Sequence, residues 1–495
     1  MRKKWNLILL LAVFSGPFLL SAQEDVFSLE DCRQMALEHN RAVKMASEHE
    51  MALTSLKKAA KTQFFPNLSA NGTYLRMNKD ISLLGEDVFL PVIPSEAIVN
   101  GEFDQSVLVN DPELLAETFV LTDFMGTPVP ALDDDGNPVF QNYAYLPKDE
   151  ASISMKNLFL LNVGFTQPVY MGGKIREMYK MSQYGEKLFN AKKELSIDEV
   201  IIKTDEYYWK VVSLKEKLEL TRQYRQMIEN LVQDLENIYN EGIITNNEVL
   251  KARVKMNEVE LNYMKTNNGL QLARMALNQT LGLPLDTLIH LKDSVAAPSS
   301  VENLSDYKAS ALSQRPEVAM LEQTINLAES GEKIMRSRYL PNIGLTANYT
   351  FINPNPYGGF EEEFGGDWNV GVVMNIPIYH WGDRRHTLEA MQHEKRAAEQ
   401  KYEEAREQIS LEVHQKMFTY HESLKKVELT ESSLKQAQEN LKITKDNFDE
   451  GLAKSTDVLE AQTMWQEAYS DYIDAKTESR IAYSYLLKAG GQLNY

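Results

Sequence analysis

The first candidates for chemistry are residues that could hold a metal ion. His386 and His393 lie seven residues apart, whereas two histidines that share a zinc ion on one helix stand four apart. The run Asp133–Asn137 (DDDGN) resembles part of a calcium loop but lacks the downstream ligand spacing. We interpret the histidines as solvated helix residues and the run as a polar turn, so we expect no metal site.

Motifs for catalysis or cofactor binding are missing from the sequence, which has no P-loop, no HExxH, no GxSxG and no dinucleotide-binding GxGxxG. We therefore expect no catalytic residue and no cofactor, and the chain is not predicted to be an enzyme. The net charge of −19 and the pI near 5.0 argue against nucleic-acid binding, because that function needs a basic face.

The N-terminus indicates export. Residues 1–22 have Arg2, Lys3 and Lys4 before an apolar run and end in small residues, which is typical of a secretory signal peptide. An uncleaved anchor helix is the alternative. The single cysteine, Cys32, cannot form an internal disulfide. It follows SLED rather than a lipobox, so we interpret it as a packed helix residue and not as a lipidated one.

The sequence contains two copies of one unit. FFPNLSANGTYL (64–75) aligns with YLPNIGLTANYT (339–350) at an offset of 275 residues. GFTQPVYMGGK (164–174) aligns with VVMNIPIYHWGD (372–383) at an offset of 209. The change of offset places an extra segment in the first copy. The predicted organisation is a signal peptide (1–22), a first repeat (23–283), a linker or equatorial region (284–310) and a second repeat (311–495).

Each copy contains two alternating runs that predict β-strands, at about 67–77, 157–169, 342–352 and 367–378. Each is about as long as a tilted strand that crosses a bilayer, ~9–11 residues. A half-buried sheet of a soluble domain would alternate in the same way. Four strands are too few to close a membrane barrel, since the smallest have about eight, so a barrel would have to be shared between chains.

Two long helices follow the strand pairs, over 174–240 and 383–450. At ~1.5 Å per residue each would be roughly 100 Å long, and heptad seams indicate burial against neighbouring helices in a coiled-coil-like wall. A soluble coiled-coil rod is the alternative, but it does not explain why each helix is joined through glycines to a pair of membrane-length strands.

Each long helix ends in a related glycine motif, NEGIITNNEVLKAR (240–253) or DEGLAKSTDVLEAQ (449–462). The glycines stand where a helix C-cap needs a left-handed residue. Asn246 or Asn247, and Ser455 or Thr456, are expected to cap the next helix. The motifs therefore predict two tight helical hairpin tips, at 240–248 and 449–457.

The ordered set of signal peptide, duplicated helix–strand–strand–long helix–helix unit and paired tips resembles the TolC family of outer-membrane channel proteins. The resemblance implies an α+β membrane protein. Three chains would share a 12-stranded transmembrane β-barrel, four strands per chain, continued by a long periplasmic α-helical barrel. It also implies location in the outer membrane of a Gram-negative bacterium, and two partners, a periplasmic adaptor (membrane fusion) protein and an inner-membrane pump.

The resemblance also assigns roles to residues of the two tips. The adaptor-docking turns would contain Gly242, Ile243, Gly451 and Leu452. A charged ring at the channel entrance would contain Asp457, Glu460, Glu248 and Lys251. Lys251 stands where the second copy has Glu460, so the two could instead form a link that holds the entrance shut. Solvated helix-cap charges are the alternative for the acids.

The extra segment of the first copy, residues 78–156, is strongly acidic. It carries 15 acids and two lysines between residues 78 and 150. The topology of the resembled family would place it outside the cell. A cap, a docking loop for a partner and binding of neighbouring lipopolysaccharide through divalent cations are all open interpretations.

Two classes of function remain. The first is an exit duct of a tripartite efflux or type I secretion system, which passively conducts drugs, toxic compounds, metals or polypeptides supplied by the pump. The second is a periplasmic coiled-coil scaffold that binds partners without conducting. The sequence does not identify the substrate, because selectivity in such a duct belongs largely to the pump.

Overall fold

The computed structural model describes residues 26–79, 81–124, 127–153, 155–294 and 304–493. The predicted signal peptide, 1–22, lies outside the described residues. The chain divides into two compact units. The helical unit comprises Met1–Thr62, Gly173–Tyr339 and Ile378–Tyr495, and the strand unit comprises Gln63–Gly172 and Leu340–Pro377. Each unit takes segments from both sequence repeats, so the boundary between the units separates kinds of element rather than copies.

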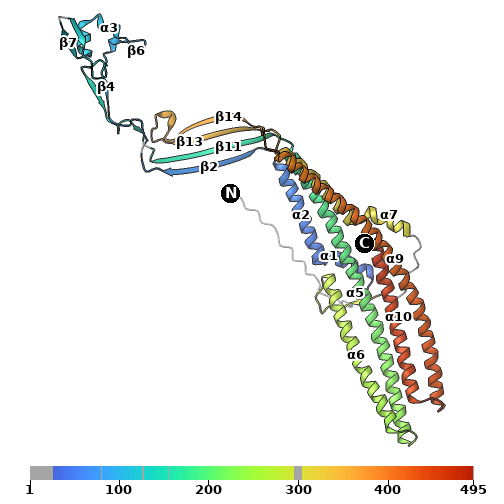
Figure 1. Cartoon of the computed structure of the whole chain (residues 1–495). Coiled ribbons are helices and arrows are strands. Elements are labelled where there is room, and N and C mark those ends of the chain that lie inside the picture. Colours follow the sequence, from blue (N-terminus) through green and yellow to red (C-terminus); the bar gives the residue numbers. More distant parts are fainter. Residues whose placement is uncertain (1–25, 80, 125–126, 154, 295–303, 494–495) are drawn as a thin grey trace, which may run out of the picture. The chain divides into compact units, whose positions relative to one another are not determined.

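The helical unit contains two very long helices and several shorter ones (Figure 1). Its helices are α1 (Leu29–His39), α2 (Arg41–Thr62), α5 (Lys174–Asn240), α6 (Asn246–Leu281), α7 (Leu304–Gln314), α8 (Pro316–Ser337), α9 (Asp383–Asp449) and α10 (Ser455–Ala489). A two-residue parallel pair, β1 (Val26–Phe27) with β12 (His290–Leu291), joins the start of the first repeat to the segment that follows this repeat. The helices α5 and α9 have 67 residues each, over the ranges expected from the sequence to within one residue.

The helices form a layer in which α5 and α9 run the full length (Figure 1). One half of the layer has the order α2–α5–α8–α9, and the other half has the order α6–α5–α10–α9. In both halves α5 has a helix on each side, whereas α9 lies at the edge of the layer. This asymmetry leaves one flank of α9 and one flank of α6 without a packed helix among the described residues.

Equivalent residues of the two repeats are buried in equivalent places. Cys32 and Ala36 of α1 are fully buried in a core with α5 and α6. Tyr307 and Ala311 of α7, 275 residues later, are buried against α9 and α10. The interpretation of Cys32 as a packed helix residue is therefore confirmed. The helix α7 starts at Leu304, inside the segment 284–310 that we expected to be a linker or equatorial region. Its buried residues Tyr307 and Ala311 pack on α9.

The strand unit is built on a four-stranded antiparallel sheet in the order β14-β13-β11-β2. Its strands are β2 (Asn67–Arg76), β11 (Asn157–Met171), β13 (Asn342–Asn353) and β14 (Gly365–Asn375). Each repeat supplies one outer and one inner strand, and β11 pairs with β13 across the duplication. Consequently β2 and β14 are the two edges of the sheet, each with one strand partner among the described residues.

The last strand is placed differently from the prediction. We expected it over 367–378, but β14 begins at Gly365 and ends at Asn375. The early end has a physical reason, because Pro377 has no backbone N–H to donate to a ladder. The segment that follows keeps large exposed side chains, with Ile378 91% exposed.

The insertion 78–156 is a chain of small antiparallel pairs with its own core. The pairs are β3 (Ile81–Ser82) with β10 (Ser152–Ile153), β4 (Val88–Pro91) with β9 (Tyr143–Leu146), β5 (Ile98–Val99) with β6 (Glu102–Phe103), and β7 (Leu121–Phe124) with β8 (Thr127–Pro130). Two short helices, α3 (Gln105–Val109) and α4 (Pro112–Thr118), complete it. The core holds Ala97, Leu108, Leu115 and Phe119, with Phe140 packed against Phe119 at 4.9 Å between ring centroids.

Candidate functional site: the paired hairpin tips

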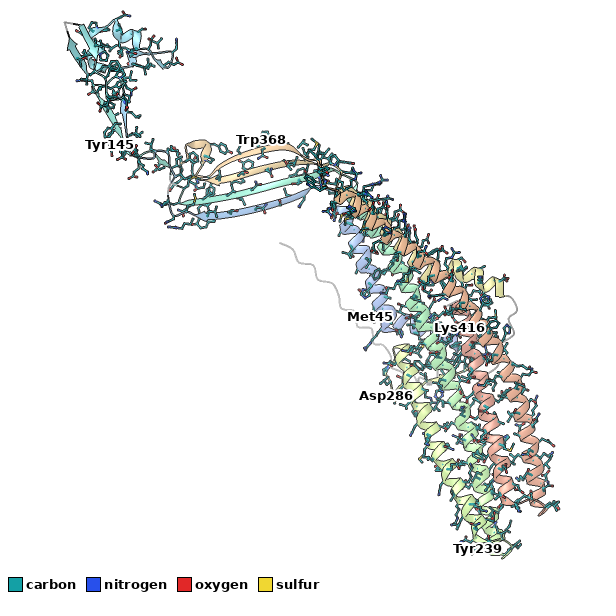
Figure 2. All side chains as sticks on the ribbon, viewed as in Figure 1. Met45, Tyr145, Tyr239, Asp286, Trp368 and Lys416 are labelled. Atoms are coloured by element: carbon teal, nitrogen blue, oxygen red, sulfur yellow. The ribbon has the colours of Figure 1, made fainter. Side chains whose placement is uncertain are left out.

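Both hairpin turns have the same backbone geometry. Gly242 and Gly451 each adopt φ of 76°, the left-handed conformation predicted for them. In the first turn Gly242 N–H donates to Tyr239 O at 2.8 Å and Ile243 N–H to Ile238 O at 3.2 Å. These two bonds are the Schellman pattern that satisfies the last carbonyls of a helix. Tyr239 marks this end of the helical unit in Figure 2.

The residues after each glycine are exposed. Ile243 is 70% and Leu452 80% exposed, so each tip presents one large apolar side chain to its surroundings. Such residues are available for contact with another molecule. The two tips of one chain also share a small core, which contains Leu235 and Val249 of the first hairpin and Val458 of the second.

The helix caps differ from the prediction. The cap residue of α6 is Thr245 and that of α10 is Lys454, one position before the expected residues. Asn246 and Ser455 are therefore the first helical residues. The reason in the second tip is that the Asp457 carboxylate accepts a hydrogen bond from Lys454 N–H at 3.0 Å, which satisfies the free N-terminal N–H without a capping side chain from Ser455 or Thr456.

Glu248 joins the two tips of one chain. Its Oε2 accepts a hydrogen bond from the Ser455 hydroxyl at 2.6 Å, and its Oε1 forms an ion pair with Lys251 Nζ at 2.9 Å. The hydrogen bond from Ser455, with the nearby Lys251 amino group, holds the pKa of Glu248 below its usual range. The carboxylate therefore stays charged while it ties α6 to α10.

Of the four predicted ring residues, Glu248 and Lys251 are joined by an ion pair. Lys251 pairs with Glu248 on its own helix rather than with Glu460. Asp457 is occupied as a cap, and both Asp457 and Glu460 are exposed. Among the described residues no ion pair joins Lys251 to Glu460. Sequence reasoning missed Ser455 as the partner of Glu248, since the two lie 207 residues apart and no local pattern relates them.

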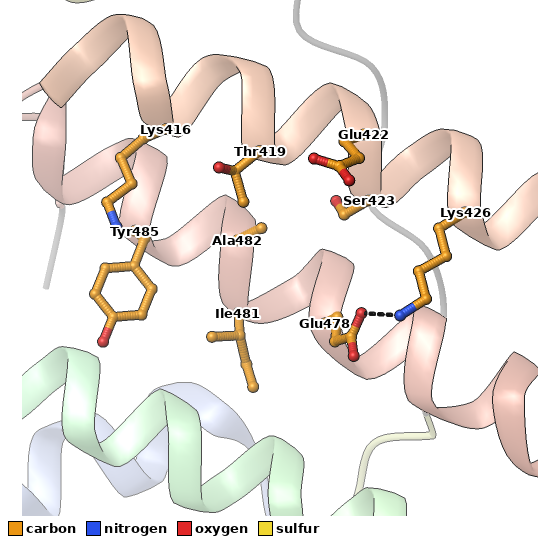
Figure 3. A pocket seen from close by; sticks show the side chains of 9 residues that line it. All are labelled: Lys416, Thr419, Glu422, Ser423, Lys426, Glu478, Ile481, Ala482 and Tyr485. Carbon is orange, nitrogen blue, oxygen red and sulfur yellow. Dashed lines mark hydrogen bonds and ion pairs between the residues drawn. The ribbon is translucent and has the colours of Figure 1, made fainter. Parts of the chain in front are cut away.

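A cavity of about 380 Å³ lies between α9 and α10 (Figure 3). The amino group of Lys416 stands 4.6 Å from the centre of the Tyr485 ring, a cation–π contact. Lys426 and Glu478 form an ion pair at 2.6 Å across the opposite end. The cavity combines paired charges with an apolar floor, and it holds no nucleophile–base pair in the arrangement that acyl transfer requires.

The two candidate metal sites have no metal-binding geometry. The His386 side chain is 76% exposed and its Nδ1 lies 3.5 Å from Glu389 Oε2. The Asp133 carboxylate accepts hydrogen bonds from the backbone N–H groups of Asp135 and Asn137. The bond from Asn137 lowers the pKa of Asp133. The run is thus a polar turn, as expected. Within the described ranges, no group of three or more His, Cys, Asp or Glu side chains could hold a metal ion.

No helix of the described segments is both long enough and apolar enough to cross a bilayer.

A family comparison decides where the chain belongs. The model of the outer membrane efflux protein family matches residues 149–283 and 309–492, which is more than half of the chain. The chain belongs to this family. The match confirms the resemblance to the TolC family, the α+β fold of the chain and its location in the outer membrane of a Gram-negative bacterium. The barrel shared by three chains stays a prediction.

Individual relatives agree with the family match. The chain is 20% identical over 302 residues to the alkaline protease secretion protein AprF of Pseudomonas aeruginosa, covering 60% of this chain and 62% of AprF. It is 21% identical over 306 residues to the outer membrane protein TolC of Vibrio cholerae, covering 60% and 68%. The crystal structure of the CmeC outer membrane channel of Campylobacter jejuni superposes with a TM-score of 0.67 at 17% identity, covering 98% of this chain and 94% of CmeC.

Proposed function

We propose that this outer membrane efflux family member is the exit duct of a tripartite efflux or type I secretion system. Three chains form a trimer with a shared barrel of four strands per chain, continued by a helical tube. The duct conducts passively what an inner-membrane pump delivers through a periplasmic adaptor. The name of AprF, a protease secretion protein, supports the secretion branch of this proposal, and the family name supports efflux.

The observation that carries the proposal is a row of exposed apolar residues on α9. Phe418 is 69% and Leu429 58% exposed. Their repeat equivalents in α5, 209 residues earlier, are Trp209 and Leu220, which are only 4% and 3% exposed. Trp209 lies under the Arg480 guanidinium of α10 at 5.1 Å. The exposed residues Phe418 and Leu429 of α9 are therefore as apolar as their buried equivalents, but within the described part of the chain no helix covers them.

The flank of α6 shows the complementary pattern. Met264 is 49% and Leu272 67% exposed, while their equivalents in α10 are Ile473, fully buried, and Ile481, partly buried. An α6 helix from a neighbouring chain placed on α9 would repeat the internal contact of α10 with α5. A head-to-tail contact of this kind generates a closed ring when its rotation closes.

The sheet also has open sides that a neighbouring chain could cover. Its edge strands β2 and β14 have open outer sides among the described residues, and open edges favour pairing with another chain. A barrel shared by three chains pairs β2 of one chain with β14 of the next, and it exceeds the ~8 strands of the smallest membrane barrels.

Heat-modifiable migration and membrane fractionation test this assembly. We expect a trimer that resists SDS until heated, co-fractionates with outer membranes and conducts ions in a planar bilayer. A monomeric periplasmic pool without conductance would instead support the coiled-coil scaffold.

We further infer that Asp457 and Glu460, with Glu248 and Lys251, form a charged ring at the entrance. Three copies of each exposed carboxylate around one axis repel one another and attract cations. Asp457→Asn combined with Glu460→Gln should raise basal conductance and weaken block by divalent cations. The matched control is Glu241→Gln, an exposed acid in the turn but outside the ring positions. Unchanged conductance and unchanged cation block would contradict the ring.

The exposed tips are the proposed docking points for the adaptor. Ile243→Cys and Leu452→Cys, each carrying a photoactivatable crosslinker, should capture the adaptor in cells. A cysteine at Leu285, which is 50% exposed and distant from the turns in the sequence, serves as control. Equal capture from Leu285 would argue against docking at the tips.

A further inference from the structure

The insertion carries a two-stranded ribbon that is apolar throughout. We define the apolar ribbon as the eight residues of β4 and β9, Val88–Pro91 and Tyr143–Leu146. All eight have apolar or aromatic side chains and none is buried. Phe89 is 63% and Tyr145 55% exposed, and their rings meet at 5.2 Å. Figure 2 labels Tyr145 on this ribbon.

One residue of the apolar ribbon, Tyr143, contacts the rim of the insertion's core: its ring lies 6.1 Å from the Phe140 ring, and its hydroxyl accepts a hydrogen bond from Phe140 N–H at 3.3 Å. The other seven ribbon residues are not part of that core. That core is formed by other residues, among them Leu108 and Phe119, and neither β4 nor β9 has a second strand partner among the described residues. A lone two-stranded ribbon is marginally stable in water. Natural proteins protect such edges with charges or a covering element, and the apolar ribbon has no charged side chain.

We propose that the apolar ribbons of the three subunits pack against one another in the assembled trimer and form an apolar cap contact. This inference rests on the proposed function, since it requires the trimer. It goes beyond the family assignment, because the family model begins at residue 149 and most of the insertion lies outside it.

The place where the insertion leaves the sheet favours a second copy of this chain as the occupant. The insertion connects β2 to β11, which pair at Arg76 and Asn157. Because β2 is an edge strand, the shared barrel puts the start of each insertion at a boundary between subunits. Three insertions tethered to one rim have a high effective concentration, which for short linkers reaches about the millimolar range. At such a concentration, weak apolar contacts are sufficient to hold the three ribbons together.

The charge of the insertion predicts how this contact responds to salt. The 15 acids between residues 78 and 150 all lie outside the apolar ribbon. Nearest to it, Asp87 accepts the Tyr145 hydroxyl and the Lys148 N–H. Three such insertions repel one another at low salt, so screening should strengthen the ribbon contact. A contact based on ion pairs would weaken instead.

Crosslinking of Phe89→Cys in the purified full-length trimer tests the proposal. A short bis-maleimide joins two thiols only, so we expect covalent dimers after denaturation. The native Cys32 can stay, because it is fully buried and burial raises the pKa of its thiol to about 12. The yield should rise when NaCl is increased from about 0.1 M to about 1 M, which shortens the Debye length from ~10 to ~3 Å.

The matched control is Leu132→Cys, which lies in the same insertion and has the same 63% exposure as Phe89 but stands outside the apolar ribbon. We expect its yield to be several-fold lower. Equal yields, no dimers from Phe89→Cys, or a yield that falls with salt would each overturn the ribbon contact. Heat-modifiable migration of the same samples separates the two proposals, because an intact trimer without ribbon crosslinks contradicts the ribbon contact alone.

Discussion

At the scale of single residues, a buried carboxylate fastens the first helix. Asp205 is fully buried, and Arg33 donates two hydrogen bonds to it, at 2.8 and 2.6 Å. The Ser484 hydroxyl donates a third at 2.5 Å. Removing one partner of a buried pair leaves an unpaired charge and costs about 3–5 kcal/mol. Arg33→Ala should lower the thermal midpoint of the helical unit, followed by circular dichroism in detergent.

Arg33→Lys should recover only part of the loss, since lysine cannot form the two-bond fork. Glu30→Gln is the control, because Glu30 lies 3.6 Å from Arg33 but is 68% exposed. An Arg33→Ala midpoint equal to that of Glu30→Gln would show that the buried pair does not hold α1.

Asp198 makes stability depend on pH. Burial raises the pKa of this α5 carboxyl from 3.8 to about 6, with Lys488 opposing the shift and Glu317 adding to it. The folded state therefore binds the Asp198 proton more tightly than the unfolded state does. The stabilisation that results is fully present below pH 3.8 and is lost as the pH rises through about 6. Asp198→Asn should remove this loss of stability at rising pH, because asparagine does not ionise. Above pH 7 the variant should be more stable than the parent by about 1 kcal/mol after allowance for solvent screening.

Thermal melts of both proteins at several pH values across this window check the prediction. Glu199→Gln, an exposed acid on the same helix, controls for a general change of charge. Parallel pH profiles for parent and Asp198→Asn would contradict the assignment.

What the sequence could predict at this scale was local. Gly242 and Gly451 were predicted to be left-handed, because a helix that ends in a tight turn needs that conformation. The predicted cap positions were wrong by one residue. In the second tip this is because the Asp457 carboxylate, inside the helix, accepts the hydrogen bond at the cap. The pair of Arg33 with Asp205 spans 172 residues, and only the packed layer brings them together.

At the scale of elements, the insertion folds around its own core and should respond separately from the helices. Phe119 is 1% exposed and packs on Phe140. Phe119→Ala should cost the insertion about 3–5 kcal/mol, so proteolysis within 78–156 should speed up while the melting of the helices stays unchanged. Leu132→Ala, at a 63% exposed position, should change neither. A Phe119→Ala variant in which the helices also melt at a lower temperature would show that the insertion stabilises the helices.

The long helices could be predicted because heptad spacing persists over many turns and glycines mark both ends. The fold of the insertion could not. Its strands have two to four residues, too short for an alternating pattern, and its core brings together Ala97 and Phe140, far apart in the sequence. The acidic composition alone indicated only a solvated segment.

At the scale of the whole molecule, the duplication explains why a chain whose helices already pack in a layer still has exposed apolar flanks and open sheet edges. The second copy covers the first, since α10 packs on α5. The equivalent packing of α6 on α9 does not occur among the described residues. The same holds for the sheet, where β11 meets β13 inside the chain and β2 and β14 remain at the edges. The proposed ring of identical chains would cover both flanks with contacts that the single chain already makes once.

The exposed flank of α9 gives the sharpest test of that ring. Phe418→Glu places a charge where the repeat equivalent, Trp209, is 4% exposed. The charge would be buried against α6 of the next chain, so the heat-stable trimer should dissociate at a lower temperature, while the monomer keeps its helix content. Gln408→Glu is the matched control, since it adds the same charge on α9 at an exposed position whose equivalent, Glu199, is already an exposed acid. Trimers of both variants that dissociate at the parent temperature would exclude α9 from the subunit contact.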